Sequence, residues 1–292
     1  MKLSCLLNNM EYEKEYELIK DKDFETLGLV ASVVDKSMCT FIENEKYIRS
    51  ISNNVNMIIT TKSIYESNLL IGNYGICLAE RPKNMFFKIH NFLKDDISYA
   101  HNNFETKIGL NCIISEKASI AKNNVIIGDN CIIEDFAVIK ENTVIGNNVV
   151  IRSSSIISRE GFEFKSDDDI FFHVNHLGKV IIGDNVEIQD LTCVDRAIYP
   201  WDSTIIGVNS KIDCLCQIGH GAKIGKNALI AGSNTIGGRS IVGDNVITGG
   251  RVSIMHGGLK IGDNAFIGLG SVVIKNVKKS ERVFGNPAKK VF

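Results

Sequence analysis

The chain has 292 residues, of which 44% are hydrophobic and 23% are charged, and its formal net charge is −1. This length allows two domains, and the balanced charge excludes the strongly basic surface typical of nucleic-acid-binding proteins. The sequence shows neither a signal-peptide pattern nor a long apolar span, and its eight cysteines include no CxxC pair. We therefore expect a cytoplasmic protein with reduced thiols, no membrane span and no nucleic-acid partner.

Residues 1–105 show no regular repeat. Strand-like runs at 28–34, 55–61 and 74–80 alternate with helical stretches, and residues 86–93, just after Pro82, resemble a short amphipathic helix. The pattern predicts a small α/β domain, which we interpret as a nucleotide-binding domain.

Within this domain, Phe41, Asn44 and Tyr47 are spaced three residues apart. On a helical turn this spacing places two aromatic rings and one amide on the same side, which suits stacking on a flat base and hydrogen bonding to it. Aromatic residues with this spacing also occur in hydrophobic cores, so core packing is the alternative.

A six-residue period begins near Lys107 and places Ile or Val at every sixth position, with Gly, Asn or Asp often beside it. Such repeats predict a parallel β-helix in which three units form one triangular coil of 18 residues. The fold class is therefore mainly β. We expect coils from about 107 to 276 within a domain of residues 106–283, followed by a tail at 284–292. The period slips by one residue at 123–124.

Two segments interrupt the period. Residues 158–179 lose it completely, and we expect an excursion loop there, without structure of its own and with a functional role. Residues 197–203 form a second irregular unit, but the twelve residues between Val194 and Ile206 suggest that the coils stay in phase.

The repeat places His220 and His256 at the same position of the turn, 36 residues or two coils apart, with Gly238 midway between them. Because Gly238 has no side chain, a slot between two imidazoles is expected there. His220 is the candidate general base for an amine or hydroxyl that attacks a thioester, and the Gly238 N–H would stabilise the oxyanion. Solvated turn histidines without a catalytic role are the alternative.

Two carboxylates are candidates for orienting His220. Asp202 lies 18 residues before it, which suggests a position one coil below, and Asp213 is closer in sequence. The pattern leaves both open.

Four segments resemble the bacterial UDP-3-O-acylglucosamine N-acyltransferase family: VIIGDNVEI (180–188), TCVDRA (192–197), DSTIIG (202–207) and CQIGHGAKIG (216–225). The GFEF run at 161–164 and the spacing of Phe41, Asn44 and Tyr47 also match that family. The resemblance implies a left-handed β-helix and a homotrimer with active sites in clefts between adjacent subunits.

The same resemblance implies a UDP-linked amino sugar as acceptor and an acyl-thioester donor, either acyl carrier protein or acyl- or acetyl-CoA, as co-substrate. No permanently bound cofactor and no metal are implied. His220 matches the catalytic base and Gly238 the oxyanion donor. Phe41, Asn44 and Tyr47 match the uridine-binding residues, and Phe162 and His256 are further candidate substrate contacts.

The chain departs from the family at several positions. Cys214 and Gly221 replace asparagines, Gly258 stands where the family has its second histidine, and the family's C-terminal helical extension is replaced by VFGNPAKKVF. The GNPA run resembles acetyl-CoA-dependent sugar acetyltransferases, which makes sugar O- or N-acetyl transfer an alternative function.

Two further alternatives are weaker. A zinc carbonic anhydrase on this helix requires two histidines five residues apart, which neither His173 with His176 nor His220 with His256 provides. A non-catalytic scaffold would leave the aromatic–amide set and the histidines at the repeated turn position unexplained.

Overall fold

The computed structural model describes residues 1–100 and 103–291 and divides into two compact units. The N-terminal unit contains residues 1–101 and 162–175, and the β-helix unit contains residues 102–161 and 176–292. Within the described ranges, no helix combines the length and the apolar character that a membrane crossing requires.

The N-terminal unit is built on a five-stranded sheet in the order β1-β5-β4-β3-β2, in which only the β1–β5 pair is antiparallel. Its strands are β1 (Tyr16–Lys20), β2 (Thr26–Leu27), β3 (Met38–Ile42), β4 (Val55–Thr60) and β5 (Gly75–Ala79). Its helices are α1 (Leu3–Asn9), α2 (Lys62–Glu66) and α3 (Pro82–Phe92), with 3₁₀ turns η1 (Glu45–Ser50) and η2 (Leu93–Asp95).

The expected strands at 55–61 and 74–80 and the helix near 86–93 are confirmed by β4, β5 and α3, which begins with Pro82 at its first position. The expected strand at 28–34 is wrong. That run turns, with the Ser32 N–H donating to the Leu29 carbonyl at 2.8 Å, and Val33 is 87% exposed. The strand forms instead at β3, where four of the five residues are buried.

The excursion also differs from expectation, because it is a β-hairpin rather than a loop without structure. Strands β15 (Phe164–Asp167) and β16 (Ile170–His173) pair antiparallel, so the hairpin satisfies its own backbone groups. Helix α3 of the same unit holds it: Asn84 donates to the Ser166 carbonyl at 2.8 Å and Asn91 donates to the His173 carbonyl at 2.6 Å. Residues 162–175 therefore belong to the N-terminal unit.

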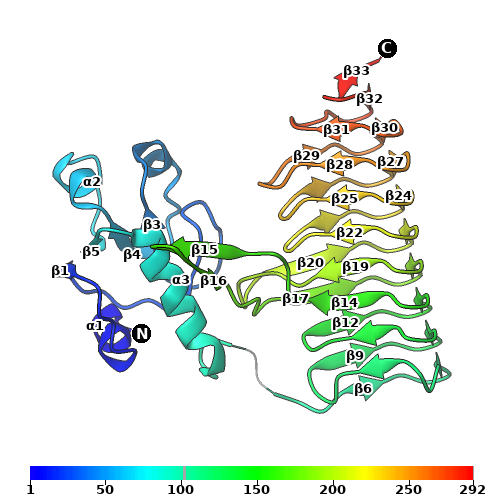
Figure 1. Cartoon of the computed structure of the whole chain (residues 1–292), viewed down its shortest axis with the longest axis horizontal. Coiled ribbons are helices and arrows are strands. Elements are labelled where there is room, and N and C mark those ends of the chain that lie inside the picture. The colour runs from blue at the N-terminus through cyan, green and yellow to red at the C-terminus, as the bar shows by residue number, and fades with distance from the viewer. Residues whose placement is uncertain (101–102, 292) are drawn as a thin grey trace. The chain divides into compact units, whose positions relative to one another are not determined.

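The β-helix unit consists of three parallel sheets that share every coil (Figure 1). The first contains β7 (Ile113–Ile114), β10 (Ile132–Ile133), β13 (Val150–Ile151), β18 (Glu187–Ile188), β21 (Lys211–Ile212), β24 (Leu229–Ile230), β27 (Ile247–Thr248), β30 (Phe266–Ile267), β32 (Arg282–Phe284) and β33 (Lys289–Lys290). The second contains β8 (Ser119–Ile120), β11 (Val138–Ile139), β14 (Ile156–Arg159), β19 (Cys193–Asp195), β22 (Gln217–Ile218), β25 (Thr235–Ile236), β28 (Ser253–Ile254) and β31 (Val272–Val273). The third contains β6 (Lys107–Ile108), β9 (Val125–Ile127), β12 (Thr143–Ile145), β17 (Lys179–Ile182), β20 (Ser203–Ile206), β23 (Lys223–Ile224), β26 (Ile241–Val242) and β29 (Lys260–Ile261).

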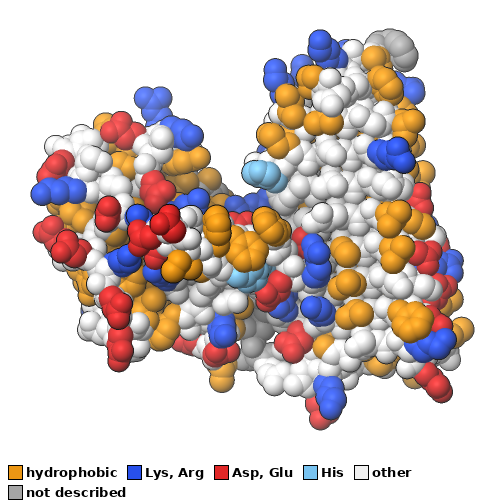
Figure 2. Space-filling view, viewed as in Figure 1, with side chains coloured by type: hydrophobic (Ala, Val, Ile, Leu, Met, Phe, Trp, Pro, Cys, Tyr) orange, Lys and Arg blue, Asp and Glu red, His pale blue; other side chains and the backbone are white. Residues whose placement is uncertain are grey.

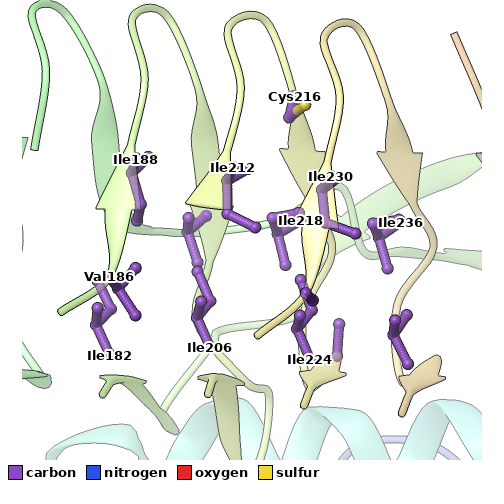
Figure 3. Close-up of a cluster of buried hydrophobic side chains, with 14 of the residues drawn as sticks. Ile182, Val186, Ile188, Ile206, Ile212, Cys216, Ile218, Ile224, Ile230 and Ile236 are labelled. Carbon is purple, nitrogen blue, oxygen red and sulfur yellow. The ribbon is translucent and has the colours of Figure 1, made fainter. Parts of the chain in front are cut away.

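The predicted phase of the repeat is confirmed. Ile212, Ile218 and Ile224 lie on β21, β22 and β23, one in each sheet, and all three point inward into a continuous aliphatic core (Figure 3). Asparagines adopt left-handed φ at the turns, and Asn209, Asn227 and Asn245 form a hydrogen-bonded ladder from coil to coil. Each coil therefore repeats the geometry of its neighbour.

The C-terminal boundary of the helix was predicted too early. Beyond residue 276, β32 pairs in parallel with β30, and β33 folds back on β32 as an antiparallel strand. Val277 and Val283 are each only 5% exposed and extend the core, because they fill inward positions although the spacing of the repeat has changed. Residues 284–292 are thus not a separate tail as far as they are described.

Candidate active site

One corner of the β-helix collects the candidate catalytic residues. The turns after β14, β19, β22, β25 and β28 stack there, as the register of Ile157, Val194, Ile218, Ile236 and Ile254 requires. Both irregular segments leave the prism at this corner, the hairpin after β14 and residues 196–202 after β19. The hairpin leaves two coils before the turn that carries His220, and residues 196–202 leave one coil before it.

The predicted stacking of His220, Gly238 and His256 is confirmed by this register. His220 is half-buried, and its imidazole lies directly against Gly238: a Cβ added there would be 2.7 Å from His220 Nε2. The space expected to be open between two histidines is thus covered by the ring of His220. His256 is exposed and is followed by Gly257 and Gly258, both with positive φ.

The backbone at Gly238 differs from that of its neighbours in its hydrogen bonds. The neighbouring Gly237 N–H donates to the Ile254 carbonyl and the Arg239 N–H donates to the His220 carbonyl, both at 2.9 Å. Among the described residues the Gly238 N–H makes no such coil-to-coil hydrogen bond. A peptide N–H beside an imidazole is the arrangement that acyl transfer requires, with a proton acceptor and an oxyanion donor side by side.

The structure corrects the position of Asp202. Val194 pairs with Ile218, so this coil contains six extra residues, and Arg196 rather than Asp202 stacks below His220. The extra residues nevertheless bring Asp202 back to the corner, where its Oδ2 lies 3.0 Å from the point a Cβ of Gly221 would occupy. Asp202 Oδ1 accepts hydrogen bonds from Lys223 Nζ at 2.6 Å and from the Ser203 N–H at 2.7 Å.

Asp213 lies at a different corner, after β21, and lines a cavity of about 280 Å³ with Gln189, Lys211 and Leu229. The structure therefore favours Asp202 as the carboxylate near His220. Gly221, where the resembled family has asparagine, has a φ of +68° and leaves room for Asp202.

Below the histidine turn lies a buried polar layer. The Gly221 N–H donates to Thr204 Oγ1 at 2.8 Å, and that hydroxyl donates to the Asp195 carbonyl at 2.6 Å. The Asp195 carboxylate is 2% exposed and accepts a hydrogen bond from Arg159 Nε at 2.8 Å, which raises the pKa of Arg159. These hydrogen bonds fix the position of the His220 turn relative to the coil that precedes it.

Cys214 and Cys216 lie between β21 and β22 and are not activated as nucleophiles. Burial raises the pKa of Cys216 to about 11, and burial is also the main cause that raises the pKa of Cys214. Both stay protonated at neutral pH, and only a thiolate reacts readily with a thioester. Over the described part of the chain, no group of three or more His, Cys, Asp or Glu side chains is arranged to hold a metal ion.

The N-terminal unit brings Phe41, Asn44 and Tyr47 to one pocket of about 470 Å³, lined by Leu29, Val30, Phe41, Glu43, Asn44, Lys46, Tyr47 and Lys83. The expected helical turn is only partly present, because Phe41 lies on β3, Asn44 caps η1 and Tyr47 lies within η1. The chain bends between the strand and the turn, and this bend brings the three residues together.

The pocket is held by specific contacts. Glu43 accepts a hydrogen bond from the Lys83 N–H at the start of α3, at 2.9 Å, and Asn44 Oδ1 accepts one from the Lys46 N–H at 3.1 Å. Phe41 packs against Phe86 with ring centroids 5.0 Å apart, whereas Tyr47 is 47% exposed with Lys46 Nζ 4.8 Å from its ring centre. Phe41 is thus held in place by packing and lines the pocket, whereas the exposed Tyr47 ring is accessible to a ligand.

Comparison with known proteins agrees with this architecture. Residues 124–159 match the family model described as bacterial transferase hexapeptide (six repeats). A UDP-3-O-acylglucosamine N-acyltransferase of Legionella pneumophila is 45% identical over 74 residues, which are 25% of this chain and 21% of the relative. The one of Campylobacter lari is 38% identical over 131 residues, 44% of this chain and 40% of the relative. The solved structure of Arabidopsis UDP-N-acetylglucosamine acyltransferase superposes with a TM-score of 0.56 at 29% identity and covers 64% of each chain.

The chain thus contains a left-handed β-helix, with bacterial transferase hexapeptide repeats at residues 124–159. Its matches span less than half the length of these curated relatives.

The sequence predicts Phe162 as a substrate contact, whereas His176 is weighed there only as a zinc ligand and is not linked to His220. Phe162 lies in the N-terminal unit, is 87% exposed and packs against Phe164, with ring centroids 5.0 Å apart. His176 belongs to the β-helix unit, is fully buried and lies 5.6 Å from His220 between ring centroids. The one available signal was its position just before the repeat resumes at residue 180.

Proposed function

We propose that this protein transfers an acyl group from a thioester to the amine of a UDP-linked amino sugar. The amine nitrogen attacks the thioester carbonyl carbon, and His220 takes the proton that the nitrogen loses. The Gly238 N–H donates to the oxyanion of the tetrahedral intermediate. The C–S bond then breaks, the amide forms, and the departing thiolate takes the proton that His220 holds. The observation that carries the proposal is the His220 imidazole lying against Gly238, whose N–H is not used between the coils.

The N-terminal pocket supports a nucleotide-linked acceptor. Phe41 and Tyr47 offer aromatic surface for a uracil ring, and Asn44 offers an amide for its polar edge. Lys46 and Lys83 line the same pocket and would place positive charge near a diphosphate. The curated relatives are named for a UDP-acylglucosamine acceptor, which agrees with this chemistry.

The acyl donor has two candidate forms, acyl carrier protein and CoA. Transfer of acetyl from acetyl-CoA to a sugar amine or hydroxyl is the second candidate function, and the GNPA run at residues 285–288 favours it by resemblance. Both reactions use the same base and the same oxyanion donor. We place the reaction in the cytoplasm, where such donors are made.

We further propose a homotrimer with active sites between adjacent subunits. The outward side chains of four neighbouring strands, β9, β12, β17 and β20, are aliphatic: Ile126, Val144, Ile181 and Ile205. Apolar side chains also recur from coil to coil on the face in Figure 2, interspersed with charges of both signs. Such rows favour burial against another subunit. Sedimentation showing a stable monomer at micromolar concentration would remove the between-subunit site.

The test is to incubate the purified protein with UDP-amino sugars and either acyl-carrier or CoA thioesters, and to detect products by mass spectrometry. We expect an acyl adduct on a UDP-amino sugar. His220→Ala should lower turnover about 10²–10⁴-fold, while folding and nucleotide binding persist. His256→Ala should cost less, because His256 lies exposed two coils from the base. Absence of product with every donor, or normal turnover in His220→Ala, would contradict the proposal.

A further inference from the structure

His176 lies at the end of the hairpin, where the chain returns to the β-helix. Its side chain is fully buried, and its ring meets the His220 ring edge to face, with centroids 5.6 Å apart and an interplanar angle of 79°. On another side His220 lies against Gly238. The imidazole of His220 is therefore bounded by an aromatic ring and by a peptide.

The backbone after His176 is held firmly. The Leu177 N–H donates to the Ile198 carbonyl and the Gly178 N–H donates to the Ala197 carbonyl, both at 2.8 Å. A Cβ at Gly178 would lie 2.6 Å from the Tyr199 carbonyl oxygen, so only glycine allows this approach. The two irregular segments thus hold each other, and together they fix the position of His176.

The His176 ring also packs closely against Gly161. A Cβ at Gly161 would lie 3.0 Å from His176 Nε2 and 3.1 Å from Asp195 Oδ2. The missing side chain of Gly161 therefore lets a buried imidazole and a buried carboxylate share one small space. Because Asp195 is paired with Arg159, this layer has a defined geometry on which the His176 ring rests.

We propose that His176 is a positioning residue, whose flat buried ring holds the His220 imidazole against the Gly238 peptide. This inference rests on the proposed role of His220 as the base. A base must be held within a fraction of an ångström of its productive geometry, and a displacement of about 1 Å costs about 10²-fold in rate. Residues 176–178 and the 196–202 segment thereby contribute to catalysis through His176, which touches neither acceptor nor donor.

A matched pair of variants tests the ring. His176→Phe and His176→Leu both remove the ring nitrogens and keep the space filled, but only the first keeps a flat ring. We expect His176→Leu to lower kcat about 10- to 100-fold with KM for the nucleotide sugar unchanged. We expect His176→Phe to retain kcat within about threefold. His173→Leu, on the same hairpin but in the N-terminal unit, is the control and should leave kcat unchanged.

A second readout does not depend on activity. In the full-length protein labelled with ¹³C-histidine, the Cε1–H resonance of His220 should shift in His176→Leu, because the ring current of the neighbouring ring is lost, while the His256 resonance stays in place. Equal kcat and an unshifted His220 resonance in His176→Leu would overturn the inference, as would a His176→Phe variant as slow as His176→Leu. If the wild type transfers no acyl group, the proposed function fails, and the resonance still decides whether His176 holds His220.

Discussion

The two units of this protein are organised in different ways. In most of the β-helix unit each side chain meets residues about 18 positions away, so one coil fixes the next, and the core is a column of small aliphatic side chains. In the N-terminal unit the contacts join distant segments, such as α3 with the hairpin at 164–173. The candidate base lies on the regular unit, at the corner from which the segments after β14 and β19 leave. The repeat supplies a rigid frame, and the interruptions supply the groups around the base.

The largest expected effect tests the regular unit. Ile218→Asp places a carboxylate at a fully buried core position without a partner, and should lower the free energy of unfolding by more than about 4 kcal/mol. Gln217→Asp, one residue earlier and pointing outward, is the control and should change stability little. Thermal unfolding of both variants would measure the difference, and similar melting temperatures would contradict the inward assignment.

A smaller effect should be confined to the N-terminal unit. Burial lowers the pKa of His90 to about 4. Its Nε2 donates to the Asn175 carbonyl and its Nδ1 accepts from the Tyr99 hydroxyl, as a neutral ring does. In the unfolded chain His90 therefore binds a proton below its ordinary pKa near 6.5, whereas in the folded unit it stays neutral down to about pH 4. The free energy of unfolding should be unaffected by His90 above pH 6.5 and should fall by up to about 3 kcal/mol as the pH drops to 4.

Hydrogen exchange of α3 and β-helix amides across this pH range would measure the effect. His90→Gln should remove the pH dependence between 6.5 and 5. Asp167 and Asp168 have lowered pKa values, so their protonation destabilises the folded unit only at more acidic pH. That part of the pH dependence should persist in this variant. An identical slope in wild type and His90→Gln would show that His90 is not the group responsible.

The smallest effect concerns the pocket. Tyr47→Ala should weaken binding of UDP by roughly 1–3 kcal/mol if the exposed ring stacks on the base. Tyr65→Ala, an exposed tyrosine on α2 outside this pocket, serves as the control. Isothermal titration of UDP into both variants would give the two affinities. Unchanged affinity in Tyr47→Ala would return Tyr47 and Phe41 to a packing role.

Much of the β-helix could be predicted because the position of each residue follows from its place in the six-residue unit and the 18-residue coil. The inward positions of Ile212, Ile218 and Ile224 and the stacking of His220, Gly238 and His256 depend only on coil length. Counting failed for Asp202, because the coil before His220 has six extra residues that a count between Val194 and Ile206 does not show. It also failed after residue 276, where Val277 and Val283 fill the core without the usual spacing.

The rest depended on contacts between distant residues. The hairpin at 164–173 has polar and aromatic residues without a repeat, and its pairing with α3 arises from Asn84 and Asn91, about 80 residues earlier. His176 could not be linked to His220 for the same reason. The site around Tyr47 was predicted from residue spacing together with the family resemblance, but its lysines could be identified only once β3, η1 and α3 were placed.

The central claim is that His220 acts from its place against the Gly238 peptide, and Gly238→Ala tests it most directly. The new methyl group would lie 2.7 Å from His220 Nε2, so the ring must move, while the backbone at this position tolerates alanine. We predict that turnover of a UDP-amino sugar falls about 10²-fold with an unchanged melting temperature. In Gly232→Ala, where the nearest atom is the end of the Asp213 side chain at 3.1 Å, turnover should stay normal. Equal turnover in the two variants would contradict the account.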